Sequence, residues 1–384
     1  KSVLMSCLNN INVQSGLMKQ CLLENNLLQA LKHCLNFLNE LRTSQLPPKQ
    51  YYEIYMVVFD SLEILSSHLL TSYQAKVKKK STSSFLSDLY ELVQYSGNIV
   101  PRLYMMILVG TTYMLTEEAP KKEIMKDMIE MCHGVQHPIR GLFLRYYLSQ
   151  RIKDLLPIAT KQDLNETVDF LVSNFLEMNK LWVRLQHQGH SSERELRYKE
   201  RHEMKILVGS NLVRLSQIID DFSGDENFKP VTFYKEKIFP VITEQIIQCK
   251  DHLAQSYLID VIIQIFPVNF HFATLHELLN DTFLNLRPSI KKSELVLTLV
   301  ERFITYHHFE YESLSEINAL DVSNPENVVE KGGNSEAGNA FKEFWEFYLK
   351  LVETDPSLPS EEHSSMLQAF IKLSMTYEPT NFAN

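Results

Sequence analysis

Acidic residues in one short stretch are the strongest candidates for metal-assisted chemistry in this sequence. Asp220, Asp221 and Asp225 lie in DDFSGDEN, where clustered carboxylates could bind Mg²⁺ as they do in helical synthases. Such enzymes need a second metal-binding motif on a facing helix, and NDTFLNLRP at 280–288 lacks the later Ser/Thr and Glu of that motif. The stretch most simply describes an acidic loop, and a magnesium-dependent all-α synthase is the least favoured hypothesis.

Histidine and cysteine residues occur in two further stretches that could bind a metal. CHGVQH contains Cys132, His133 and His137, and HQGH contains His187 and His190. A zinc site needs four converging ligands, usually as pairs at close spacing, and HQGH lacks the glutamate of HExxH. Glycine-rich phosphate loops and the GxSxG motif do not occur in the sequence. We therefore predict no catalytic residue, no metal site and no cofactor, and we expect that the protein is not an enzyme.

Helices would have to position any functional residue in this chain. Glycine makes up only 11 of the 384 residues, which favours helices over turn-rich β structure. Apolar residues recur at helical spacing, as in NNLLQALKHCLNFLNELR and in PPKQYYEIYMVVFDSLEILSSHLL. Beyond residue 100 the predicted helices are 101–116, 121–132, 138–156, 163–188, 192–221, 230–248, 250–266, 270–286, 290–309, 340–353 and 360–376.

Short turns between these helices predict antiparallel helix pairs. Pro101 and Pro138 each open a predicted helix, are each soon followed by arginine, and lie 37 positions apart, close to the period of two-helix repeats. We therefore predict an all-α fold, an α-solenoid of antiparallel helix pairs, with a compact all-α bundle as the alternative. The acidic stretch at about 310–339 is expected to be a mobile insertion, so residues 1–384 form a single segment.

Net charge and cysteine usage restrict the partners and the compartment. The chain carries a net charge of −9, so attraction to nucleic acid is not expected. The basic run Lys76 to Lys80 could touch a membrane surface, although a solvated loop is the simpler explanation. Five cysteines without a CxxC pair favour reduced thiols in the cytosol. The longest uncharged apolar run, 103–115, is too short to cross a membrane, so any membrane role would be peripheral.

An apolar helix with one arginine at its start is the most unusual feature of the sequence. In VPRLYMMILVGTTYML, Pro101 suits the first helical position, but Arg102 places a cation at the positive end of the helix dipole. The helix is apolar on all sides, which predicts burial on more than one face. Either neighbouring helices of the same chain bury it, with Arg102 paired to an internal acid, or a partner covers part of it. The residue pattern alone favours internal burial.

Three long motifs carry a family resemblance: DLYELVQYSGNIVPRLYMMILVG, KKEIMKDMIEMCHGVQHPIRGLFLRYYL and EMNKLWVRLQHQGHSSERELRYKERHEMKILVGSNLVRLSQ. With co-linear matches over about residues 10–310, the chain resembles the retromer large-subunit family, vacuolar protein sorting-associated protein 35. The resemblance implies an α-solenoid of HEAT-like helix pairs that acts as a non-enzymatic scaffold of an endosomal sorting coat. It also implies that this chain is the N-terminal half of such a subunit.

The resemblance assigns a docking motif to the apolar helix. Pro101, Arg102, Leu103, Tyr104 and Met105 match the PRLYL-type motif to which the arrestin-fold subunit, vacuolar protein sorting-associated protein 26, binds in the family. Met105 replaces leucine, which keeps apolarity and approximate volume. We expect Arg102 to order the motif by pairing with an acid, and Leu103 and Met105 to supply apolar contact.

Further partners follow from the same resemblance. It implies sorting nexins and cargo tails near this end of the protein, and a late-endosomal Rab GTPase. A metallophosphoesterase-fold subunit would bind only through the C-terminal half, which is absent here. The expected role is endosome-to-Golgi retrieval in the cytoplasm, peripheral on the cytosolic face of endosomes. A helical-repeat adaptor of another trafficking system remains the alternative.

Overall fold

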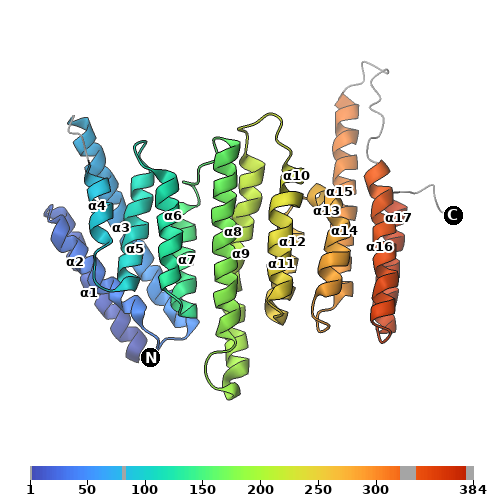
Figure 1. The fold of residues 1–384 in the computed structure, drawn as a ribbon, viewed down its shortest axis with the longest axis horizontal. Coiled ribbons are helices and arrows are strands. Elements are labelled where there is room, and N and C mark those ends of the chain that lie inside the picture. Colours follow the sequence, from blue (N-terminus) through green and yellow to red (C-terminus); the bar gives the residue numbers. More distant parts are fainter. Residues whose placement is uncertain (1, 80–83, 321–333, 378–384) are drawn as a thin grey trace. The chain divides into compact units, whose positions relative to one another are not determined.

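The computed structural model describes the backbone of residues 2–79, 84–320 and 334–377. Throughout these residues the regular elements are helices and the connections are turns, so the predicted all-α class is confirmed. The chain divides into two compact units, Lys1–Phe228 and Lys229–Asn384, and we describe each by itself (Figure 1). The prediction that the whole chain forms a single segment stays a prediction.

Unit 1 is a series of helices in which consecutive members pack against one another. The closest packing joins α1 with α2, α4 with α5, α7 with α8 and α8 with α9, as antiparallel pairs require. Short 3₁₀ turns η1, η2 and η3 interrupt the connections. The helices are α1 (Ser2–Leu23), α2 (Leu27–Leu38), α3 (Pro48–Lys78), α4 (Phe85–Val93), α5 (Ile99–Met114), α6 (Lys121–Met131), α7 (Pro138–Ile152), α8 (Lys161–Leu185) and α9 (Arg194–Asp221), and the turns are η1 (Asn39–Arg42), η2 (Cys132–Gly134) and η3 (Ser191–Glu193).

Local sequence signals explain where several of these helices begin. Thr160 and Asp163 form a reciprocal capping box at the start of α8. Pro138 occupies the first turn of α7, and the preceding His137 side chain accepts a hydrogen bond from the backbone N–H of Arg140. These contacts satisfy backbone N–H groups that have no partner within the helix, so the predicted starts of both helices are close to the observed ones.

One helix of unit 1 is long and apolar enough to cross a membrane. This helix is α3, which contains charged residues and is therefore distinct from the uncharged run 103–115. Core helices of soluble proteins share these properties, and α3 buries side chains such as Ile54, Leu62 and Leu65 against α1, α5 and α7. Packing within unit 1 therefore explains the apolar residues that α3 buries, whereas Tyr52, Met56, Ile64 and Val77 are exposed.

Unit 2 begins with short and irregular helices and ends with three long ones. The predicted helix 230–248 is split, because Pro240 has no N–H to donate and the preceding turn widens to a π-helix. The predicted helix 270–286 is split as well. The elements are α10 (Pro230–Phe233), η4 (Tyr234–Ile238), α11 (Phe239–Gln248), α12 (His252–Ile265), α13 (Val268–Ala273), α14 (Leu275–Glu277), η5 (Leu278–Thr282), η6 (Phe283–Asn285), α15 (Lys292–Leu320), α16 (Asn334–Thr354) and α17 (Ser360–Tyr377).

The predicted acidic insertion at about 310–339 overlaps helices at both of its ends. The backbone of α15 continues to Leu320, and α16 begins at Asn334. Residues 321–333 lie outside the described part of the chain. The mobility of this segment therefore stays a prediction.

Candidate partner-docking site

The apolar helix α5 is buried by its own chain. Thirteen of its sixteen residues are buried, and α2, α3, α4, α6 and α7 all pack against it. Close packing is visible at Gly110, where a Cβ would lie 3.1 Å from atoms of both Ile124 and Tyr90. The internal-burial hypothesis is therefore confirmed for the helix as a whole, and its apolar character on all sides needs no partner to explain it.

Three side chains of the predicted motif face this internal packing. Leu103, Tyr104 and Met105 are each at most 1% exposed. The Tyr104 ring packs on Tyr147 with a centroid distance of 5.1 Å, and the Cys34 Sγ donates to Met105 Sδ at 3.3 Å. A partner that docks on this structure therefore cannot contact these three side chains. Their role is to pack α5 against its neighbours and so hold the exposed residues near them in place.

Arg102 differs from its neighbours because it is only half-buried. Its Nε is covered, yet it has no hydrogen-bond partner among the described residues. We expected an internal acid to pair with Arg102, but Arg102 takes part in none of the ion pairs among the described residues. Its backbone N–H donates to the carbonyl of Asn98 at 3.0 Å, which is a contact of the helix start and leaves the guanidinium unaffected. A guanidinium therefore stands without a counter-charge at the positive end of α5.

A second arginine in the same state lies at the start of the neighbouring helix α7. A Cβ placed on Gly134 would come within 2.6 Å of Ile99 Cδ1, so the connection into α7 touches the first residue of α5. Arg140 is half-buried, and its Nε also lacks a hydrogen-bond partner within the described residues. We call Arg102 and Arg140, with the exposed Tyr95 and Ile99, the arginine edge. The sequence analysis did not propose Arg140 as a site residue, although Pro138 and Arg140 repeat the proline-then-arginine pattern of Pro101 and Arg102.

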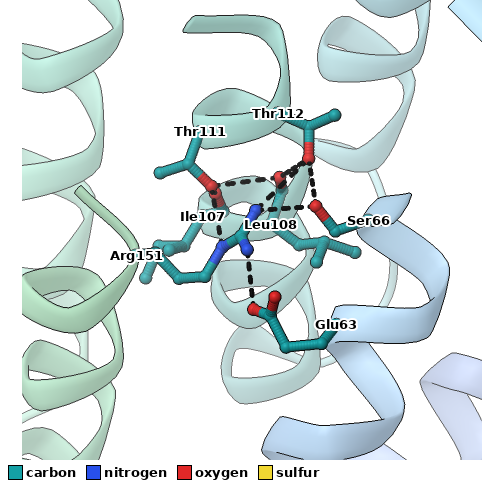
Figure 2. Close-up of polar contacts among 7 residues, drawn as sticks. All are labelled: Glu63, Ser66, Ile107, Leu108, Thr111, Thr112 and Arg151. Atoms are coloured by element: carbon teal, nitrogen blue, oxygen red, sulfur yellow. Dashed lines mark hydrogen bonds and ion pairs between the residues drawn. The ribbon is translucent and has the colours of Figure 1, made fainter. Parts of the chain in front are cut away.

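A polar network holds the other end of α5 in place (Figure 2). Arg151 of α7 donates from Nη1 to Glu63 Oε1 at 2.7 Å, from Nη2 to Ser66 Oγ at 2.8 Å and from Nε to Thr111 Oγ1 at 3.1 Å. Ser66 and Thr112 share a further hydrogen bond of 2.9 Å between their hydroxyl groups. One guanidinium thereby joins α3, α5 and α7, and it fixes the position of the helix that begins with the motif. The threonine pair in an otherwise apolar helix was the only sequence signal for this network.

Replacing Arg151 by methionine should lower the free energy of unfolding by about 2 kcal/mol, because several hydrogen bonds are lost while three hydroxyl groups stay buried or half-buried. Urea denaturation followed by far-UV circular dichroism would measure the change. Glu63→Gln is the matched control, and its cost should stay below about 1 kcal/mol because the Glu63 side chain is 43% exposed. Equal costs for the two variants would contradict a central role of Arg151.

Several of the other sequence candidates have structural roles. His137 and His190 cap helical turns, and Cys132 is buried, which raises the pKa of its thiol to about 11. Asp225 Oδ1 accepts from the backbone N–H of Asn227 at 2.9 Å, in the turn that follows α9. The described residues contain no group of three or more His, Cys, Asp or Glu side chains that could hold a metal ion.

Consecutive helices that pack in antiparallel pairs are the arrangement of an α-solenoid protein. The model of the family described as vacuolar protein sorting-associated protein 35 matches residues 3–384. The chain belongs to this family.

Curated relatives agree with this assignment. Vacuolar protein sorting-associated protein 35 of Dictyostelium discoideum is 39% identical over 98% of this chain, and that of Schizosaccharomyces pombe is 43% identical over 85% of it. Vacuolar protein sorting-associated protein 35A of Arabidopsis thaliana is 38% identical over 94% of the chain. The chain spans only 44%, 38% and 42% of the lengths of these three relatives, respectively.

Proposed function

We propose that the chain is the N-terminal part of a retromer large subunit, a non-enzymatic scaffold whose arginine edge binds the arrestin-fold subunit. Family membership supports the scaffold role. The observation that carries the docking site is the half-buried Arg102, whose guanidinium has no acid within the described residues. Because an uncompensated charge near the protein interior is unfavourable, a carboxylate from outside the chain would be a stabilising partner.

The chemistry of the arginine edge indicates what the partner should present. A guanidinium binds a carboxylate through two parallel hydrogen bonds, so Arg102 and Arg140 favour acidic residues on the arrestin-fold subunit. Tyr95 is 86% exposed and Ile99 is 38% exposed, and both could supply apolar contact at this edge. Pro101, Leu103, Tyr104 and Met105 act in this proposal as the buried frame that holds Arg102 in position.

The remaining partners complete the proposed role in endosome-to-Golgi retrieval. Sorting nexins, cargo tails and a late-endosomal Rab GTPase would bind near the same end of the protein, on the cytosolic face of endosomes. A metallophosphoesterase-fold subunit would bind the remainder of the full-length protein.

Isothermal titration of the purified chain with the arrestin-fold subunit tests the proposal. Saturable one-to-one binding that weakens as salt is raised is expected, because the contact is largely between charges. The metallophosphoesterase-fold subunit serves as the control and should not bind. At about 100 µM of the arrestin-fold subunit even a weak complex would be detected. If no binding were seen at that concentration, the docking assignment would be refuted.

A further inference from the structure

A groove of about 470 Å³ lies in unit 2, and none of the residues that define the arginine edge lines it. This volume is in the range of sites that bind small molecules or short peptide segments. Both π-helical turns of unit 2 contribute to its walls, Lys235 from η4, and Asp281 and Thr282 from η5. Such turns change the direction of side chains within a helix and often occur at functional sites. The helix α11 supplies most of the remaining wall.

The α11 side of the groove carries an apolar surface. Phe239, Pro240 and Ile247 line it, and Phe239 is only 5% exposed. The hydroxyl of Thr243 donates to the carbonyl of Phe239 at 2.7 Å, so its proton is already engaged within the helix. This surface can therefore accept an apolar side chain.

Charged side chains around the groove are mainly acidic. Three carboxylates, Glu244, Glu277 and Asp281, stand against one lysine, Lys235. Lys235 Nζ is already engaged by Glu277 Oε1 and by the carbonyl of Ala273, both at 2.9 Å. Glu277 Oε2 is covered and has no hydrogen-bond partner among the described residues. Glu244 and Asp281 are exposed, so the groove carries uncompensated negative charge.

We propose that this groove binds a short basic peptide segment of a partner protein. One apolar side chain would pack on Phe239 and Ile247, while flanking lysine or arginine residues would meet the exposed carboxylates of Glu244 and Asp281. The complementary charge excludes an acidic peptide and an anionic lipid surface as preferred occupants. The proposal concerns a surface of unit 2, so it does not depend on the arginine edge.

Fluorescence anisotropy of the whole chain with the labelled peptide KKLKK tests this proposal. We expect saturable binding at low salt, roughly tenfold weaker binding of KKSKK because the apolar contact is lost, and no binding of EELEE. Glu244→Lys and Asp281→Lys should each weaken KKLKK binding by roughly fivefold. The matched control is Glu294→Lys, because Glu294 is an exposed acid of α15 outside the groove, and it should leave binding unchanged. Thermal denaturation would confirm that each variant is folded.

Three results would overturn the proposal. The first is equal binding of KKLKK and KKSKK, and the second is that Glu294→Lys weakens binding as much as Glu244→Lys and Asp281→Lys do. The third is binding that never saturates. Sedimentation of the chain alone provides one further check. The α3 helix of a second copy could also occupy the groove, because it ends in the basic residues Lys76 and Lys78. If the chain self-associated and Asp281→Lys abolished this self-association, the occupant would be a second copy of the chain and not a partner peptide.

Discussion

Replacing Arg102 by glutamate should weaken binding of the arrestin-fold subunit on the order of 100-fold and should not destabilise the chain. Removal of the guanidinium breaks no ion pair within the described residues, since Arg102 forms none there. A carboxylate at the start of α5 is favourable to the helix dipole, so stability should be unchanged or higher by up to about 1 kcal/mol. The same carboxylate would repel the acidic residues that we expect on the partner. Titration calorimetry and thermal denaturation of the same sample measure both effects.

Two further arginine variants make this result specific. Arg140→Glu should weaken binding less, by roughly tenfold, because Arg140 belongs to the arginine edge but lies outside the motif. Arg194→Glu is the matched control, because Arg194 is an exposed arginine at the start of α9, and it should bind as the unmodified chain does. If Arg102→Glu kept full affinity, or lost it only together with thermal stability, the assignment of Arg102 as a contact residue would be wrong.

Replacing Leu103 by aspartate should have the largest effect on stability, with a loss of more than about 4 kcal/mol. Leu103 is 1% exposed, so the substitution removes a packed side chain and puts a carboxylate among apolar neighbours. We expect loss of the cooperative urea transition of unit 1 and loss of partner binding. The loss of binding would then report on the fold of α5 and would be no evidence that Leu103 touches the partner.

Leu103→Met separates these two explanations. The side chains have similar volume, so the stability cost should stay below about 1.5 kcal/mol and affinity should change less than roughly threefold. A folded Leu103→Met variant that no longer binds would show that the leucine contacts the partner directly. That outcome would contradict the internal role that its burial indicates.

Arg102 at the start of α5 and Arg151 of α7, which contacts the other end of α5, show why a local pattern does not reveal the function of a charge. Arg102 follows a proline in the motif and has no acid within the described residues, whereas Arg151 donates to a carboxylate and three hydroxyl groups. The partner Glu63 lies 88 positions from Arg151 in the sequence. Our expectation that Arg102 pairs with an internal acid was reasonable from the sequence and wrong for the described structure.

The sequence by itself determined the helical class, most helix boundaries in unit 1 and the motif that identifies the family. The helical class and the helix boundaries depend on the period of apolar residues and on prolines and capping residues. The motif depends on the identity of a few consecutive residues. All of these signals are local along the chain. The interrupted helices of unit 2 were harder to predict, because each π-helical turn is only five residues long, too short to establish a period of its own in the sequence.

Only the tertiary structure decided which side chains of the motif are accessible and which charges are paired. Leu103, Tyr104 and Met105 are buried because five other helices surround α5, and the connection into α7 touches the start of α5 at Ile99. The same holds for the acidic groove, where Lys235 meets Glu277 from another helix. Pairing and burial depend on distances between segments far apart in the sequence, and helical periodicity carries no information about those distances.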